Sequence, residues 1–290
     1  VYRGIDIYDL VNGFIREDRF GFEECVYLLL FGQLPTSHQL EDFNQVLGHY
    51  RKLPEDYVRD NILKAPSMDV MNKLARLVLV KYSYDSNPDD ISVLNLLRQS
   101  LDLIATFPLM GCYGYQAKAH YHEGKSLFIH NPRPDYSTAE NILMLLRPDG
   151  QFTALEAKIL DLALVLHAEH GGGNNSTFTA HVVSSSGTDI FSCVAAAIGS
   201  LKGPKHGGAN NKVIDMMADL KQSVANWEDE DELSAHLEKI LRKQAFDGTG
   251  LIYGMGHAVY TLSDPRCILL RDQAEQLATA VGREAELNLH

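Results

Sequence analysis

The sequence predicts an all-α protein, and three observations support that fold class. Apolar residues recur at the three- and four-residue spacing of amphipathic helices along most of the chain. No stretch shows the sustained alternation of apolar and polar residues that is typical of a half-buried strand. Helix start and stop signals flank several of the periodic segments. A length of 290 residues is enough for a large buried core and for two domains.

Five helices are expected in the first half of the chain. Residues 22–31 form an apolar run that ends at Gly32 and Pro35. Residues 37–51 place leucine, phenylalanine and valine on one face and stop before Pro54. The same periodicity predicts helices over residues 68–82, 91–105 and 109–122.

Further helices are expected in the second half. Ser137 and Glu140 have the spacing of a capping box, in which each side chain bonds the backbone N–H of the other residue. Residues 153–170 form a long helix with Glu156 in the same position relative to its start. The remaining expected helices cover residues 190–201 and 209–220, and one begins at residue 265.

Composition and charge argue against several classes of protein. Acidic residues outnumber basic ones by 38 to 26, and a net charge of −12 argues against nucleic acid or an acidic membrane as a partner. We find no apolar run long enough for a membrane span and no signal peptide at the start. The four cysteines are widely separated, so we expect a cytoplasmic protein with reduced, mostly buried thiols. The acidic stretch 228–232 is expected to be a solvated helix start or loop.

Three histidines, each in a glycine-rich segment, indicate an active site. His170, His206 and His257 lie in His-Ala-Glu-His-Gly-Gly-Gly-Asn-Asn-Ser, Gly-Pro-Lys-His-Gly-Gly-Ala-Asn and Gly-Met-Gly-His-Ala-Val-Tyr, respectively. Imidazole exchanges protons near neutral pH, and glycine lets a ligand approach the backbone closely. Together with the later Arg266, these segments predict a site for a small anionic substrate.

His206 comes just before an expected helix start. The positive end of the helix dipole disfavours imidazolium, so a neutral ring there can donate a hydrogen bond to a developing oxyanion. The alternative is a capping or turn histidine, and the segment alone does not decide between them. Glycine and proline over residues 203–208 also suggest a hinge.

The segment before His257 carries four glycines within residues 248–256, so its backbone can present N–H groups to a ligand. The spacing is not that of a dinucleotide fingerprint, and a flexible loop is the alternative. Asp264 and Pro265 have the pattern of an N-cap and a first helical residue. Arg266 would then project from the first turn as a carboxylate clamp, with a surface arginine as the alternative.

No metal site is expected. His167 and His170 lie three residues apart, but the sequence has no His-Glu-x-x-His motif and no third ligand at a typical spacing. We interpret His170 as the ligand contact and His167 as structural. His120 and His122 are interpreted as residues of a helix surface.

The three histidine segments and Asp264-Pro265-Arg266, in this order, resemble the citrate synthase family. Tyr2–Asp6, Phe22–Glu24 and Ala139–Asn141 extend the resemblance over nearly the full length. The resemblance implies a mostly helical homodimer in which a smaller helical domain closes over the active site. The implied domains are residues 1–206, the large domain, and residues 207–290, the small one.

The resemblance also implies a role for each site residue. His206 would hydrogen-bond the acetyl-CoA carbonyl as the enol forms, and His257 would protonate the oxaloacetate carbonyl. His170, Arg266 and Asn174 would contact oxaloacetate, and Ser176 would support His206. Acetyl-CoA is implied as a co-substrate, with no metal and no permanently bound cofactor. The residues implied to receive coenzyme A are Leu251, Ile252, Tyr253, Gly254, Met255 and Gly256.

One feature departs from the family pattern. The family's proton-abstracting aspartate lies well beyond the His257 segment, and Asp272 comes too early to match it. We therefore expect a C-terminally truncated citrate synthase that is inactive or nearly so. The alternatives are a 2-methylcitrate synthase, which uses propionyl-CoA, and a non-catalytic dimerisation or ligand-binding fragment.

Overall fold

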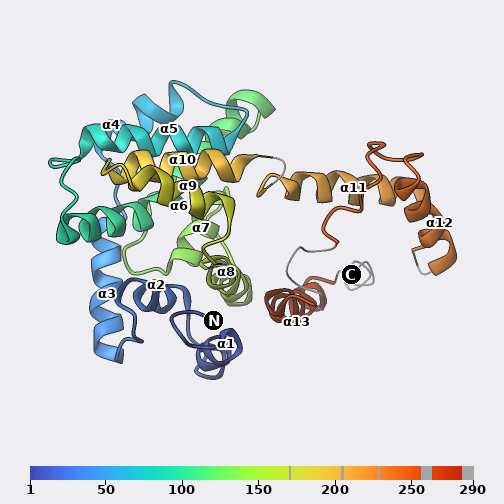
Figure 1. Ribbon diagram of the computed structural model, residues 1–290, viewed down its shortest axis with the longest axis horizontal. Helices are drawn as coiled ribbons and strands as arrows, with labels where there is room; N and C mark the ends of the chain where they lie inside the picture. The colour runs from blue at the N-terminus through green and yellow to red at the C-terminus, as the bar shows by residue number, and fades with distance from the viewer. Residues whose placement is uncertain (170, 204–205, 228, 256–262, 283–290) are drawn as a thin grey trace. The chain divides into compact units, whose positions relative to one another are not determined.

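The computed structural model describes residues 1–169, 171–203, 206–227, 229–255 and 263–282. The chain divides into two compact units, Val1–Ser200 (unit 1) and Leu201–His290 (unit 2). Over the described ranges it is helical and contains no strand beyond one isolated bridge between Tyr2 and Ile5, so the all-α prediction is confirmed (Figure 1). The predicted domain boundary after residue 206 stays a prediction.

One π-helical segment, η1 (Val58–Leu63), and one 3₁₀ turn, η2 (Tyr82–Tyr84), lie among the α-helices of unit 1. Within the described ranges, no helix is both long enough and apolar enough to cross a membrane. The α-helices up to the end of unit 1 are α1 (Ile7–Arg16), α2 (Phe22–Phe31), α3 (Ser37–Tyr50), α4 (Glu55–Tyr57), α5 (Val70–Lys81), α6 (Val93–Glu123), α7 (Thr138–Leu146), α8 (Ala154–His167), α9 (Asn175–Ser184) and α10 (Ile190–Lys202). Unit 2 contains α11 (Ala209–Ser223), α12 (Glu230–Leu241) and α13 (Pro265–Ala280).

Local capping explains where many of these helices begin. The capping box predicted at Ser137 is confirmed: Ser137 N donates to Glu140 at 2.7 Å, and Glu140 N donates to Ser137 Oγ at 3.2 Å. Thr153 and Glu156 form a second box at α8. Helix α2 has the predicted bounds and ends at Gly32, whose φ of 77° is the left-handed conformation that glycine adopts without strain.

The prediction of two helices over residues 91–122 is wrong, because α6 is continuous from Val93 to Glu123 and contains Pro108. A proline removes one backbone hydrogen bond from a helix interior and costs about 3 kcal/mol. The residues on either side of it are buried in the core, including Ala105, Leu109 and Met110. Their burial offsets that cost, and packing of this kind is not visible in the local sequence.

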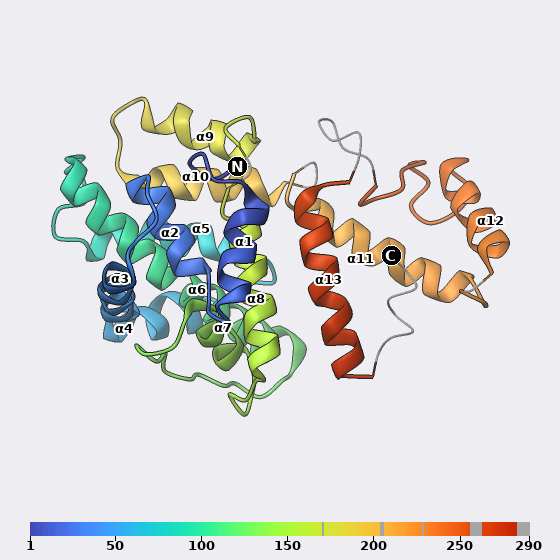
Figure 2. The ribbon, with the colours of Figure 1, turned by 90° about the horizontal axis from the view of Figure 1, so that it is seen from below.

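Helix α6 organises the core of unit 1. It packs against α3, α5 and α7, and Figures 1 and 2 show it between α5 and α7. Tyr57, Leu109, Met110 and Phe191 are fully buried in the main cluster, where Tyr57 Oη donates to the carbonyl of Leu77. Unit 2 has its own smaller cluster between α11 and α12, with Met216, Leu220, Val224 and Ile240 buried.

A buried ion pair joins three helices of unit 1. Arg51, the residue after α3, donates to Glu23 of α2 at 3.0 Å and to Thr138 of α7 at 3.1 Å. Glu23 also accepts a 2.7 Å bond from Thr138 N. The guanidinium additionally donates to the backbone carbonyl of Tyr136. Both charged side chains are at least nine-tenths buried, so each depends on the other for its solvation.

Asp161 of α8 supplies a cap to a different helix. Helix α2 begins after Gly21, which has no side chain to cap it. Instead, the Asp161 carboxyl accepts bonds from Gly21 N at 2.6 Å and Phe22 N at 3.2 Å. Burial raises the pKa of Asp161 to about 7, the charge of Glu23 adds to the increase, and the two N–H groups oppose it.

This raised pKa predicts a pH-dependent stability. Between about pH 4 and 7 the folded chain retains the Asp161 proton that the unfolded chain has lost, so the contribution to stability falls as pH rises. An increase from 3.8 to about 7 corresponds to about 4 kcal/mol at most. We expect the stability of Asp161→Asn, relative to the unmodified protein, to increase from pH 4.5 to 8 in denaturant titrations followed by circular dichroism. A constant difference across that range would contradict the prediction.

Candidate functional site

The sequence-predicted site residues are distributed over both units. His170, His257 and Gly256 lie outside the described residues. Asn174 and Ser176 belong to unit 1. His206, Arg266 and the remaining residues of the predicted coenzyme segment, Leu251 to Met255, belong to unit 2.

In unit 1, Asn174 is the N-cap of α9. Its Oδ1 atom accepts bonds from Ser176 N at 3.2 Å and Ser176 Oγ at 2.9 Å. Because the capping oxygen faces the helix, the Nδ2 amide is the part of this side chain suited to a substrate carboxylate. The adjacent Asn175 Nδ2 donates to Ser200 Oγ at 2.6 Å, which ties the start of α9 to α10.

In unit 2, His206 precedes the start of α11, as predicted, and it lies in a tight turn. Its N–H donates to Gly203 O at 2.9 Å, and its carbonyl accepts from Ala209 N at 3.1 Å. Gly208 is the N-cap, and a Cβ atom added there would lie 2.7 Å from Lys202 O. A Cβ atom added to Gly207 would lie 2.9 Å from Leu201 O. The backbone therefore passes so closely over itself that only glycine fits after the histidine.

The predicted coenzyme segment is attached to the same end of α11. Gly254 approaches Val213 so closely that an added Cβ atom would lie 3.3 Å from Val213 Cγ2. Lys212 Nζ lies 3.5 Å from Asp247 Oδ2, just before the segment. Residues 212 and 213 are in the first turns of α11, which begins three residues after His206. The structure thus brings the His206 turn and the predicted coenzyme segment to one end of one helix.

Asp247 is a residue of this site that the sequence analysis did not identify. Its Oδ1 atom accepts from Thr249 N at 3.1 Å and Thr249 Oγ1 at 2.7 Å, and its Oδ2 atom accepts from Tyr253 Oη at 2.8 Å. Burial alone would raise the pKa of Asp247, but the hydrogen bonds from Thr249, Tyr253 and Lys212 outweigh it and lower the pKa to about 2. The Asp-Gly pair at 247–248, which is typical of turns, was the available sequence signal.

Arg266 lies at the start of α13, and Asp264 caps that helix through Arg266 N at 2.9 Å, as predicted. The same carboxylate also binds the guanidinium, with Arg266 Nη2 to Asp264 Oδ2 at 2.6 Å. Both side chains are about one quarter exposed. A substrate carboxylate would have to share this guanidinium with Asp264, and the predicted clamp role stays a prediction.

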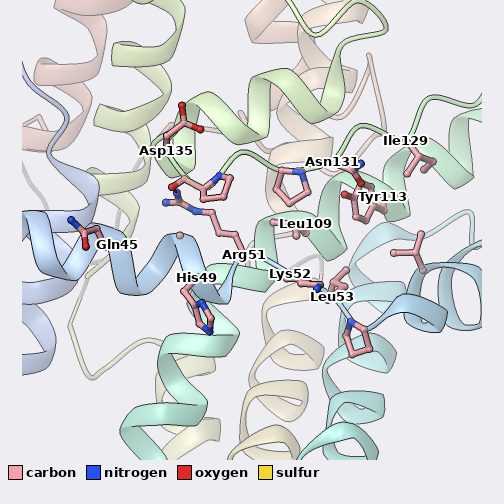
Figure 3. A pocket seen from close by; sticks show the side chains of 15 residues that line it. Gln45, His49, Arg51, Lys52, Leu53, Leu109, Tyr113, Ile129, Asn131 and Asp135 are labelled. Atoms are coloured by element: carbon pink, nitrogen blue, oxygen red, sulfur yellow. Dashed lines mark hydrogen bonds between the residues drawn. The ribbon is translucent and has the colours of Figure 1, made fainter.

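Three cavities in unit 1 are lined by residues between Glu17 and Glu140, well before the predicted site residues in the chain. One of them, of about 930 Å³, lies between the end of α3, α6 and the loop at residues 129–135 (Figure 3). Arg51 is one of the residues that line it, but its guanidinium is held in the buried ion pair described above. Among the described residues, no group of three histidine, cysteine or acidic side chains is arranged to hold a metal ion.

The helices and the glycine-containing loops define a two-unit, all-α protein with a candidate binding site at the start of α11. The family model for the citrate synthase C-terminal domain matches residues 1–290. The chain belongs to the citrate synthase family.

Individual relatives agree with this membership. A 2-methylcitrate synthase of Shewanella oneidensis is 33% identical over 97% of this chain and 68% of its own length. A citrate synthase of Synechocystis is also 33% identical, over 98% of this chain and 65% of its own length. The chain therefore spans about two thirds of the length of these relatives.

Solved structures show the same fold. The citrate synthase of Pyrobaculum aerophilum superposes with a TM-score of 0.76 at 30% identity, covering 97% of this chain and 66% of that one. The citrate synthase of Thermoplasma acidophilum, solved as a ternary complex with carboxymethyl coenzyme A and oxaloacetate, gives a TM-score of 0.75 at 22% identity over 93% of this chain and 65% of that one.

Proposed function

We propose that the protein containing this chain condenses acetyl-CoA with oxaloacetate and water to give citrate and coenzyme A. Family membership supports an acyltransferase of this kind. The observation that carries the proposal is the packing of the segment at 247–255 on the first turns of α11, directly after the His206 turn. That packing would place a thioester carried by the segment near an imidazole.

In this reaction a base removes a methyl proton from the thioester, and the carbonyl oxygen gains charge as the enol forms. We assign His206 as the hydrogen-bond donor to that oxygen, because a preorganised donor stabilises charge that develops in the transition state. His257 would assist attack on the oxaloacetate carbonyl. His170, Arg266 and Asn174 would hold the dicarboxylate, with Ser176 supporting His206. Coenzyme A would lie on residues 251–256, and no metal or resident cofactor is required.

Family membership alone does not determine whether the acyl group is acetyl or propionyl. Both 2-methylcitrate synthases and citrate synthases are among the relatives, and the two relatives named above are each 33% identical to this chain. One methylene in a pocket changes discrimination by about 1–3 kcal/mol. The ratio of kcat/KM for acetyl-CoA and propionyl-CoA, measured with oxaloacetate on the protein that contains this chain, tests the proposal. Turnover of acetyl-CoA at least tenfold more efficient supports citrate synthase, the reverse supports 2-methylcitrate synthase, and no turnover of either overturns condensation. The expected inactivity of the 290-residue chain stays a prediction, which the same assay tests on that chain by itself.

We also propose that the protein is a homodimer that uses α9. This helix has no buried residue, and Phe178 and Val182, one helical turn apart, are 61% and 52% exposed. Covering an apolar stripe of this kind with a second copy would remove it from water.

Phe178→Asp tests the dimer. A carboxylate in an apolar contact has no partner, so we expect the variant to sediment as a monomer at concentrations where the unmodified protein is a dimer. The matched control is Tyr121→Asp, which places the same charge on an exposed aromatic position of α6. Equal sedimentation of Phe178→Asp and the unmodified protein would contradict the role of α9.

A further inference from the structure

The segment from the end of α12 to residue 255, which includes the described part of the predicted coenzyme segment, has a backbone that needs an external constraint. Gly248, Gly250 and Gly254 have φ values of 69°, 79° and 83°, and Phe246 has a φ of 55°. Glycine loses more conformational entropy on ordering than any other residue, and a bulky residue rarely adopts a positive φ. The segment therefore cannot hold this shape through its own backbone preferences.

Side chains of the segment supply that constraint at two points. Ile252 and Tyr253 pack against the hydrophobic cluster of unit 2, and the Tyr253 ring meets Phe246 edge to face at 6.0 Å. The Asp247 carboxylate collects three hydrogen bonds from Thr249 and Tyr253 and lies against Lys212 of α11. Leu251, between these anchors, and Met255, just after them, are 56% and 76% exposed. The anchored residues thus present an ordered stretch of backbone and two apolar side chains to solvent.

We propose that Asp247 is a positioning residue for the acyl-CoA co-substrate: it fixes residues 248–255 against the start of α11 in the shape that receives the coenzyme. This inference rests on the proposed function. Asp247 touches no substrate in this role and acts through Thr249, Tyr253 and Lys212. Without the anchor, the loop becomes ordered only when the coenzyme binds, and the entropy cost of that ordering weakens binding.

The test is a set of substitutions assayed in the protein that contains this chain. Loss of a bond to a charged group corresponds to about a ten- to hundredfold loss of affinity. We expect Asp247→Ala to raise KM for the acyl-CoA by that factor and to leave the calorimetric Kd for oxaloacetate within about twofold. Thr249→Val should raise KM for the acyl-CoA by part of that factor. Thr249→Ser, which keeps the hydroxyl, should have the KM of the unmodified protein.

Asp229→Asn is the matched control. Asp229, the N-cap of α12, is another aspartate of unit 2 that accepts backbone hydrogen bonds, but from Asp231 N and Glu232 N rather than from residues 248–255. We expect its KM values to equal those of the unmodified protein. In Asp247→Ala, backbone amide exchange at residues 248–255 should be faster, while Trp227 fluorescence reports an intact core of unit 2.

The outcomes separate this inference from the proposed function. If the unmodified protein turns over the thioester and Asp247→Ala has an unchanged KM for it, the positioning role is wrong. If oxaloacetate affinity falls as far as thioester affinity and Trp227 fluorescence changes, the role of Asp247 is general stability and the inference is also wrong. If the unmodified protein has no condensing activity, the proposed function fails. Calorimetry with coenzyme A alone then decides, since weaker binding to Asp247→Ala supports positioning and equal binding overturns it.

Discussion

Replacing His206 with alanine is expected to lower kcat for condensation by about 10²–10³-fold, the usual loss when one preorganised donor to a developing oxyanion is removed. The turn that holds His206 is closed by backbone bonds and by two glycines packed against backbone carbonyls. Truncation of the side chain should therefore leave the turn in place. Steady-state rates with acetyl-CoA and calorimetry with oxaloacetate measure the two effects separately, and oxaloacetate affinity should change by less than about twofold.

Two further variants test whether His206 acts as a hydrogen-bond donor. His206→Gln keeps a neutral N–H donor, so its kcat should lie between those of His206→Ala and the unmodified protein. His122→Ala is the control, because His122 is an exposed residue in the last turn of α6. A kcat for His206→Ala within about threefold of the control would contradict the assignment and favour a capping or turn role.

Replacing Arg51 with methionine is expected to destabilise unit 1 by about 3–5 kcal/mol, since the substitution leaves a buried carboxylate without its partner. Arg51 and Glu23 join the ends of three helices, and Thr138 N and Oγ1 complete the network. The single tryptophan, Trp227, lies in unit 2, so fluorescence reports unit 2. Most of the described helices belong to unit 1, so circular dichroism reports mainly unit 1. The expected result is a lower denaturation midpoint by circular dichroism with little change by fluorescence.

The double variant Glu23→Gln, Arg51→Met identifies the cause. Removing the charge of Glu23 should recover part of the lost stability, because a neutral amide is less costly to bury and its oxygen can still accept from Thr138 N. Arg59→Met is the control: Arg59 is 62% exposed, and solvent screens its ion pairs with Asp56 and Asp60, so the substitution should change stability far less than Arg51→Met does. Equal losses in Arg51→Met and Arg59→Met would contradict the role of burial.

The site residues were partly predictable from the sequence. The His206 turn and the cap at Asp264 depend on residues two or three positions apart, so a short segment contains their whole geometry. The ion pair of Arg266 with Asp264 is equally local, but the sequence analysis did not predict it and interpreted Arg266 as a carboxylate clamp, with a surface arginine as the alternative. Asp247 was missed because its importance depends on Tyr253 and Lys212, which come near it only when the loop folds on α11.

The sequence by itself determined the all-α class, the bounds of α2 and the capping boxes of α7 and α8, because capping oxygens and the N–H groups they bind lie within one helical turn. The tertiary structure decided the rest. Helix α6 continues through Pro108 because its flanks are buried, and α2 is capped by Asp161, 140 residues away in the chain. Arg51 forms its ion pair with Glu23, 28 residues away in the chain. Such contacts become favourable only when packing removes the groups from water, and no local pattern in the chain records which distant residue will be there.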